Sequence, residues 1–342
     1  MSRALDYGLL MTDFSQILSD PQWLPHAFDP ARGSVTFIRI PRARLSDNAF
    51  LADATSEPGF APVEVPLGEI AAFSPPQAPQ HFIFHTAFCR STLLVRALEL
   101  PGVSAGLSEP GILARLVGKG DAGMRAVAPV AALLARPWGE GESVFVKPTN
   151  HANVLVPALM QARPDAKALL MTNPLPSFLA AVVRKGMMGR RWARTLYLEM
   201  MGYAGMDLGL DAREQFAMTD LQAGALAWFL NQRYLDALVR QFGDRVRVLD
   251  GDAFGAEPAK VLEAVGRFTG VGIDAARAAE IASGPVFTRD AKTGLDYAEK
   301  SARDAAATQS AVVEDEIGKL GEWVGAIAAQ AGVEVPLRQT LI

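Results

Sequence analysis

The chain has 342 residues and a formal net charge of −4, with 50% of its residues hydrophobic and 20% charged. A chain of this length can bury a large core and forms one large domain or two. The charge balance is that of a soluble globular protein and does not favour sequence-independent binding to a nucleic-acid polymer.

The single cysteine, Cys89, excludes an internal disulfide and fits a reducing cytoplasm. Asp6 and Asp13 interrupt any apolar run near the start of the chain, so we expect no signal peptide. No segment reaches the roughly 18 to 20 uninterrupted apolar residues that a membrane span needs. We therefore expect a cytoplasmic protein with no membrane partner. Four scattered histidines without ligand spacing predict no metal site.

The N-terminal region, residues 1–78, differs in pattern from the rest of the chain. GSVTFIRIPRARL contains alternating β-branched residues that are typical of a strand, and APVEVPL resembles another. FSPPQAPQ, residues 73–80, contains three prolines and no periodicity. It is typical of a linker between domains and equally of a surface loop within one domain. We predict a partly β N-terminal region, residues 1–78, and an α/β domain, residues 79–342.

From His81 onward, short apolar strands alternate with helices. Strands are predicted at residues 81–86, 142–149, 166–173 and 245–254, and helices at residues 91–100, 151–164, 176–185, 221–242 and 257–271. This alternation predicts a three-layer α/β/α sandwich with a parallel sheet. Ligands of such sheets bind beyond the carboxyl ends of the strands, which places Thr86, Lys147 and Thr172 at one edge.

The bend at residues 86–92 turns the first of these strands into a helix through hydroxyl-bearing side chains and Arg90. A helix start with Ser91, Thr92 and a nearby cation can bind a phosphate or sulfate, and the same residues are typical of a structural helix cap. The chain contains neither G-x-x-x-x-G-K-[ST] nor G-x-G-x-x-G, so we expect neither an ordinary ATPase or kinase P-loop nor a dinucleotide fingerprint. Cys89 is expected to pack within the loop rather than to act as a nucleophile.

The order of these segments resembles the P-loop sulfotransferases, nearest to the branch of the tyrosylprotein sulfotransferases and bacterial relatives. The family's loop, R-S-G-[ST]-T-L-L, holds the 5′-phosphate of 3′-phosphoadenosine 5′-phosphosulfate (PAPS). Residues 88–94 read FCRSTLL here, with Arg90 in place of the glycine. The resemblance implies that the donor is held by the side chains and backbone of Thr86, Phe88, Cys89, Arg90, Ser91 and Thr92.

Two further segments carry the catalytic part of the resemblance. LSEP places Glu109 where family members have a catalytic carboxylate, and VFVKPTN places Lys147 near the transferring sulfuryl group. The resemblance implies that Glu109 is the general base and that Lys147 stabilises the leaving oxygen. His85 and His151 are further candidate bases, and each is also typical of a capping or buried hydrogen-bonding histidine.

The segment that binds the 3′-phosphate in the family departs from the pattern here. Thr172 stands where the family has an arginine, and Ala180 where it has a serine, whereas Arg184 matches a ligand found in some members. Arg289 and Lys292 resemble basic residues of a late loop that folds over the nucleotide. We therefore expect recognition of the 3′-phosphate to be weakened or rebuilt.

A cluster of five cations lies within residues 184–194. These cations could compensate for the lost phosphate ligands, or they could form a solvated helix face. The final segment, residues 311–331, is typical of an amphipathic packing helix or of a contact in a homodimer.

Together these features predict a sulfotransferase-like enzyme, a transferase of sulfur-containing groups. It would pass a sulfuryl group from PAPS, the nucleotide donor, to a hydroxyl or amine of a small-molecule acceptor and release 3′-phosphoadenosine 5′-phosphate (PAP), without a metal. The N-terminal region would form the acceptor side. The alternative is a catalytically silent relative that binds a nucleotide or another anion, or acts as an interaction protein.

Overall fold

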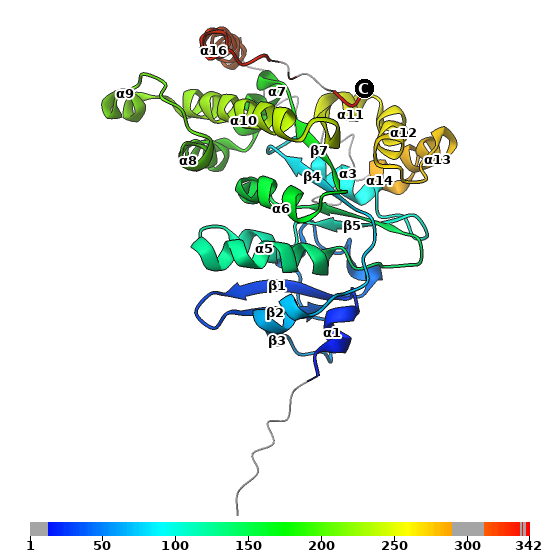
Figure 1. Ribbon diagram of the computed structural model, residues 1–342. Coiled ribbons are helices and arrows are strands. Elements are labelled where there is room, and N and C mark those ends of the chain that lie inside the picture. The colour runs from blue at the N-terminus through cyan, green and yellow to red at the C-terminus, as the bar shows by residue number, and fades with distance from the viewer. Residues whose placement is uncertain (1–12, 289–310, 336, 338–339) are drawn as a thin grey trace, which may run out of the picture.

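Two β-sheets form the framework of the protein. The computed structural model describes residues 13–288, 311–335, 337 and 340–342 (Figure 1). One sheet is antiparallel, with the strand order β1-β2-β3, and the other has five strands in the order β5-β6-β4-β7-β8.

The five-stranded sheet is parallel throughout. Its central strand β4 (Gln80–His85) lies between β6 (Ser143–Lys147) and β7 (Lys167–Thr172), with β5 (Ser104–Ser108) and β8 (Val246–Asp250) at the edges. Nearly all side chains of these strands are buried, as expected for a sheet that is covered on both faces. This confirms the predicted α/β fold with a parallel sheet.

Alternate strand residues face two different cores. Ile83 and Leu169 belong to one core, and Phe82 and Leu170 to the other. The first face is covered by α3 (Ser91–Ala97), α11 (Gly251–Ala256), α12 (Pro258–Thr269), α13 (Ala275–Ala282) and α14 (Pro285–Thr288). The second is covered by α4 (Gly111–Leu116), α5 (Gly120–Leu134), α6 (Val156–Ala162) and the second half of α10 (Asp220–Phe242). The three predicted layers are therefore present.

A third cluster of helices extends beyond the carboxyl edge of the sheet. It consists of α7 (Leu175–Arg184), α8 (Gly186–Ala204), the first half of α10, and α16 (Ala311–Gln330), with α9 (Ala212–Ala217) beside them (Figure 1). α16 packs against α7 and α10. No helix in the described part of the chain is long and apolar enough to cross a membrane.

The N-terminal region forms the antiparallel sheet from β1 (Trp23–Asp29), β2 (Ser34–Arg39) and β3 (Val63–Pro66), with α1 (Ser15–Ser19) and α2 (Leu67–Ala72). Short 3₁₀ helices are η1 (Arg42–Arg44), η2 (Leu51–Asp53), η3 (Asn150–Leu155) and η4 (Gly243–Arg245). Val35 and Phe37 of β2 share one apolar core with Val130 of α5 and with Phe82 of the parallel sheet. The described part of this region thus packs on the α/β domain rather than around a core of its own.

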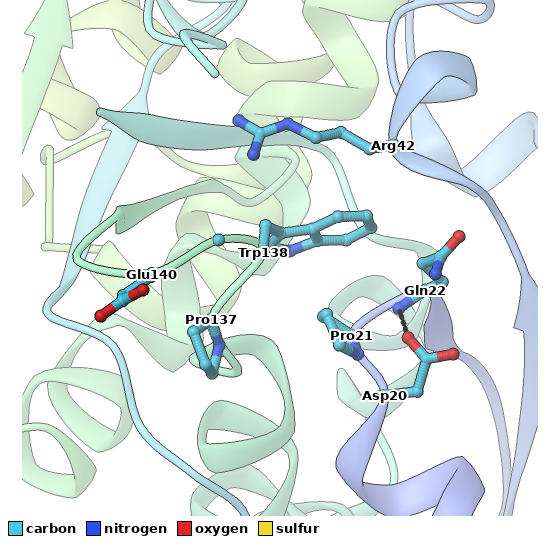
Figure 2. A pocket seen from close by; sticks show the side chains of 8 residues that line it. Asp20, Pro21, Gln22, Arg42, Pro137, Trp138 and Glu140 are labelled. Atoms are coloured by element: carbon cyan, nitrogen blue, oxygen red, sulfur yellow. Dashed lines mark hydrogen bonds between the residues drawn. The ribbon is translucent and has the colours of Figure 1, made fainter. Parts of the chain in front are cut away.

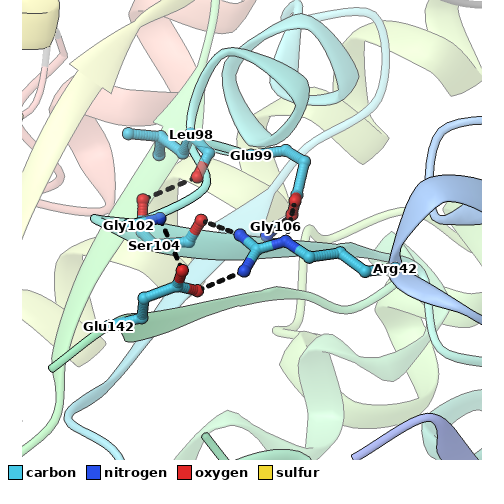
Figure 3. Close-up of polar contacts among 7 residues, drawn as sticks. All are labelled: Arg42, Leu98, Glu99, Gly102, Ser104, Gly106 and Glu142. Carbon is cyan, nitrogen blue, oxygen red and sulfur yellow. Dashed lines mark hydrogen bonds and ion pairs between the residues drawn. The ribbon is translucent and has the colours of Figure 1, made fainter. Parts of the chain in front are cut away.

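A charged network links the N-terminal region to the parallel sheet (Figure 3). The Arg42 guanidinium donates to Glu99 Oε1 at 2.8 Å, to the carbonyl oxygen of Ser104 at 2.8 Å, and to the carboxylate of Glu142. Both carboxylates also accept backbone N–H groups, from Gly106 and Gly102 respectively. Burial raises the pKa of Glu99. The network satisfies charges that would be costly to bury alone and fixes η1 beside the amino end of β5.

A second buried arginine, Arg136, ties α5 to the N-terminal region. Its side chain is 1% exposed, and its guanidinium donates hydrogen bonds only to backbone carbonyl oxygens among the described residues: those of Ile17, Leu18, Asp20, Trp23 and Leu133. The carbonyls include those left without partners where α1 and α5 end. Arg136 therefore completes the hydrogen bonding of two helix ends at once.

The structure corrects the sequence-based prediction at three strands. Residues 104–108 form β5 and residues 23–29 form β1, and neither strand was predicted. The predicted strand at residues 245–254 ends at Asp250, because the Asp250 carboxylate accepts the N–H groups of Asp252 and Ala253 and starts α11.

Fold stability should fall as the pH is lowered from 7.5 to 5, in part because of His81. Its side chain is 5% exposed, and burial, with a smaller contribution from Lys167, lowers the pKa of the imidazole from 6.5 to about 4. Between pH 6.5 and about pH 4, the His81 imidazole is protonated in the unfolded chain but not in the folded chain. The contribution of neutral His81 is therefore complete above about pH 6.5 and is lost as the pH falls towards 4, by about 2 kcal/mol at pH 5.

The variant His81→Phe keeps an aromatic ring against Phe145 but cannot titrate. In urea unfolding at pH 7.5 and 5.0, the wild type should lose about 2 kcal/mol more than this variant. His151→Gln, a change at a side chain that is 43% exposed, serves as the control and should behave like the wild type. Equal pH dependence of the wild type and His81→Phe would contradict the assignment.

Candidate active site

The bend after β4 contains backbone conformations that non-glycine residues rarely adopt. Phe88 and Arg90 have φ angles of 65° and 62°. Arg90 therefore takes the left-handed conformation for which glycine is the usual residue. The bend is held by the Thr86 N–H, which donates to the carbonyl oxygen of Met171 at 2.9 Å, and by the Cys89 thiol, which donates to the carbonyl oxygen of Thr86. Cys89 is buried, in agreement with a packing role.

The Arg90 side chain crosses from the bend to α11. Its Nη1 donates to the carbonyl oxygen of Gly251 at 2.9 Å and to Asp252 Oδ1 at 2.6 Å. Two glycines make room for this crossing: a Cβ at Gly251 would lie 2.4 Å from the Cys89 carbonyl oxygen, and one at Gly255 would lie 2.9 Å from Arg90 Nε. Arg90 therefore joins the bend to α11.

Asp252 also connects the Arg90 side chain to α7. Its Oδ2 accepts a hydrogen bond from the hydroxyl of Ser177, in the first turn of α7. One carboxylate thus occupies the space between the cation of the bend and the hydroxyl of α7. A phosphate bound to Arg90 would have to share or replace this carboxylate.

The carboxyl ends of β5 and β6 bring together a buried ion pair. Lys147, the last residue of β6, is fully buried and donates to the Glu109 carboxylate, which is 14% exposed. Glu109 has a φ angle of 49°, and its N–H donates to the Lys147 carbonyl oxygen at 2.6 Å. The Lys147 ammonium also lies 5.5 Å from the centre of the Phe50 ring, which comes from the N-terminal region.

His85 lies next to this pair. Its Nε2 is 3.8 Å from Glu109 Oε1, and its two ring nitrogens contact the carbonyl oxygens of Thr86 and Pro148 at 2.8 and 3.0 Å. Since both oxygens are acceptors, both contacts are hydrogen bonds only when each ring nitrogen carries a proton. In that state His85 donates on both sides, which suits a residue that positions the bend and the Glu109 carboxylate.

Other predicted residues lie around this centre. Thr172 Oγ1 accepts a hydrogen bond from Gln232 at 2.7 Å, inside the protein. Ser91 and Thr92 are buried at the start of α3, and the Phe88 ring packs against the rings of Phe178 and Trp192 in tilted and edge-on contacts. The Thr86 hydroxyl and the Asn173 side-chain oxygen are buried without a hydrogen-bond partner within the described residues.

The remaining predicted ligands are less central. Arg184 is the last residue of α7 and is exposed. Arg194, one of the five cations within residues 184–194, forms an ion pair with Asp220. Arg289 and Lys292 lie outside the described residues. No group of three or more metal-ligating side chains occurs within the described ranges 13–288 and 311–335.

Several residues at this edge of the sheet were not predicted from the sequence. Asp252 was missed because residues 251–254 were predicted as strand, and Ser177 and Phe50 because their contacts lie far away in the chain. His151 was only an alternative base, and its Nδ1 lies 2.7 Å from Glu199 Oε2 of α8. A polar side chain directly after a strand can be predicted from the sequence as a site residue. A contact between distant segments leaves no such signal in a single sequence.

A hollow of about 520 Å³ lies elsewhere, beside Trp138 and Arg42 (Figure 2). Arg42 contacts Glu142, which precedes β6, so this hollow lies near the amino ends of the strands. None of the predicted site residues lines it. We therefore place the candidate active site at the carboxyl edge, where the polar groups converge.

Comparison with known proteins gives remote similarities. No protein-family model matches the chain, and no curated protein matches it. Among solved structures, the sulfotransferase domain from the curacin biosynthetic pathway is similar at 13% identity and a TM-score of 0.44, over 76% of this chain and 100% of that one. A sulfotransferase from Alicyclobacillus acidocaldarius is similar at 18% identity and a TM-score of 0.32, over 71% and 97%.

Removal of the Lys147 charge should strongly destabilise the fold. Lys147→Met leaves the Glu109 carboxylate without its main partner in a largely buried place, at a cost of about 3 to 5 kcal/mol. Urea unfolding measures this cost. Lys319→Met breaks an exposed pair with Asp315 and should change stability by less than about 0.5 kcal/mol. A loss below about 1 kcal/mol in Lys147→Met would show that the buried pair does not form.

Proposed function

We propose that the protein is a sulfotransferase-like enzyme that transfers a sulfuryl group from PAPS to a hydroxyl or amine of a small-molecule acceptor. The observation that carries this proposal is the Lys147–Glu109 pair, buried at the carboxyl edge of the sheet and directly beside the bend after β4. A buried cation and carboxylate next to a strand–bend–helix turn are the groups that sulfuryl transfer requires.

The candidate site suits the 5′ end of PAPS better than its 3′-phosphate end. An anionic group near the sulfuryl end would suit Ser91 and Thr92 at the bend and Lys147. It would also suit the Thr86 hydroxyl, which is buried without a hydrogen-bond partner among the described residues. At the 3′-phosphate end, Thr172 already accepts a hydrogen bond from Gln232. The donor would therefore be held mainly through its 5′ end, with weaker recognition of the 3′-phosphate.

PAPS supplies a sulfuryl group whose bond to the nucleotide phosphate oxygen breaks as the acceptor oxygen or nitrogen bonds to sulfur. Glu109 takes the proton that the acceptor loses. Protonation of Glu109 removes the negative charge that faces Lys147, and the freed ammonium then stabilises the negative charge on the leaving oxygen. The ion pair thus couples proton removal to departure of the leaving group, while His85 keeps Glu109 in place.

The N-terminal region would supply the acceptor side. Phe50 covers the Lys147 ammonium, and the carbonyl oxygen of neighbouring Ala49 accepts the Ser108 hydroxyl at 2.9 Å, one residue before Glu109. An apolar ring at this point excludes water from the charged pair and strengthens its electrostatics. We infer that segment 46–53 contributes to the choice of acceptor.

The alternative is a catalytically silent relative, and one observation favours it. The Arg90 guanidinium of the bend is already bound to the Asp252 carboxylate, which also holds Ser177. If this bridge persists, it repels the phosphate that the bend would bind. The protein would then serve another role with an unused site.

Glu109→Gln should reduce turnover by about a hundredfold or more while nucleotide binding changes little. The amide keeps the shape and the contact with Lys147 but cannot accept the proton. Transfer of radioactive sulfate from labelled PAPS to a panel of phenols, alcohols and amines would measure this effect. Glu99→Gln, a change at a carboxylate in the network of the opposite edge, is the control and should retain turnover wherever the variant folds. Wild-type activity in Glu109→Gln would refute the proposed base.

Asp252→Asn should strengthen PAP binding by about fivefold or more, because it removes a negative charge beside the phosphate-binding bend. Calorimetric titration with PAP would measure the change. Asp236→Asn, which removes a carboxylate paired with Arg240 on α10, is the matched control and should bind like the wild type. Weaker binding in Asp252→Asn would mean that the carboxylate positions Arg90 for the ligand rather than competing with it.

A further inference from the structure

Four cationic side chains surround a second hollow, of about 510 Å³, at the amino ends of β7 and β8. Lys167 begins β7, Arg245 and Arg247 flank the first residue of β8, and Arg267 lies in the last turn of α12. The candidate active site lies at the carboxyl ends of the strands, about 15 Å away along a strand of five residues. The hollow is therefore separate from that site.

Two of the four cations, Lys167 and Arg245, are fixed by backbone carbonyl oxygens of segments distant in the chain. Lys167 Nζ donates to the carbonyl oxygen of Phe268. The Arg245 guanidinium donates at 2.7 to 3.2 Å to three carbonyl oxygens, those of Met160, Arg163 and Ala166. Carbonyl groups orient a cation without neutralising its charge, so both positive charges persist at the hollow. The Asp165 carboxylate attracts the Arg245 guanidinium electrostatically but does not line the hollow.

Arg247 and Arg267 have weak carboxylate partners, and Arg247 Nη1 also donates to the carbonyl oxygens of Val246 at 2.7 Å and Asp244 at 3.4 Å. Arg247 Nη2 lies 3.3 Å from Asp244, whose side chain is fully exposed, and Arg267 pairs with Glu263 one helical turn away at 3.0 Å. Exposed pairs of this kind contribute little and exchange readily with other anions. Asp244 is the one carboxylate among the described lining residues, so the lining has a net charge of +3, from four cations and one anion.

Apolar groups form the rest of the wall. The Phe268 ring has Lys167 Nζ and Arg247 Cζ each 5.2 Å from its centre. Leu341, near the end of the chain, closes another side, because its N–H donates to the carbonyl oxygen of Val248 at 2.8 Å. Apolar walls reduce the screening of the cations by water and so strengthen their attraction for an anion.

We propose that this hollow is a second ligand site, which takes a small molecule bearing a phosphate or pyrophosphate group. Its volume lies within the range of small-ligand sites, and two arginines provide planar donors that match phosphate oxygens. Like charges held this close repel one another, and a multiply charged anion would relieve that repulsion. The ligand would contact strand ends and the C-terminal segment together.

Inorganic pyrophosphate, titrated calorimetrically at low ionic strength, is the probe. The wild type should bind it, and Arg247→Gln/Arg267→Gln should bind at least about tenfold more weakly. Lys167 and Arg245 are left unchanged because they hold carbonyl groups of distant segments, whereas the carbonyl groups that Arg247 contacts lie within three residues of it. The control, Arg240→Gln/Lys260→Gln, removes two exposed cations paired on their own helices and should bind like the wild type.

The control variant should unfold at the wild-type temperature, since Arg240 and Lys260 are exposed. Arg247→Gln/Arg267→Gln should unfold within a few degrees of it, since Arg267 is exposed and Arg247 is partly exposed. Equal pyrophosphate affinity in the wild type and Arg247→Gln/Arg267→Gln would overturn the proposal, because binding would then occur elsewhere. Binding by the wild type weaker than about 10 mM at low salt would also overturn it.

Discussion

The ion pair between Lys147 and Glu109 is the interaction on which the candidate site depends. Lys147 is fully buried, and an isolated ammonium in such a place would cost several kcal/mol. Its partner comes from the neighbouring strand, held by a backbone hydrogen bond between the same two residues. Such a pair adds little stability compared with apolar residues of the same size. The pair is therefore the central element of the function that we propose.

The strained backbone conformations of the described residues lie close to the same ion pair. The described non-glycine residues with positive φ are Phe88, Arg90 and Glu109, and all three lie in the bend or at the carboxyl end of β5. Conformations of this kind cost about 1 to 3 kcal/mol each and persist only where the surrounding structure enforces them. Here Arg90 is anchored to α11, and Phe88 to aromatic rings of α7 and α8. The surrounding helices therefore stabilise a strained loop at the edge of the sheet.

Much of the framework could be predicted from the sequence, because buried parallel strands are continuous apolar runs and helices have caps. Strand β4 and helix α12 are clear cases, the second with Pro258 in its first turn and Gly270 at its C-cap. Strand β5 was missed because Ser104, Ala105 and Gly106 are small residues without β propensity. The place of Lys147 at the carboxyl edge followed from parallel topology, whereas Glu109 was placed near it only by the family resemblance, because β5 was not predicted. The Asp252 bridge and the contact of Phe50 with Lys147 depend on side-chain contacts between distant segments.

The most direct test of the account is a calorimetric comparison of PAP and adenosine 5′-phosphate binding to the full chain. The account predicts that both nucleotides bind through the bend, with PAP favoured by less than about tenfold because Thr172 and Ala180 provide no charged 3′-phosphate ligand. If neither nucleotide binds, the result would contradict the proposal of a nucleotide-dependent sulfotransferase. A preference for PAP of about a thousandfold would contradict the weakened 3′-phosphate site.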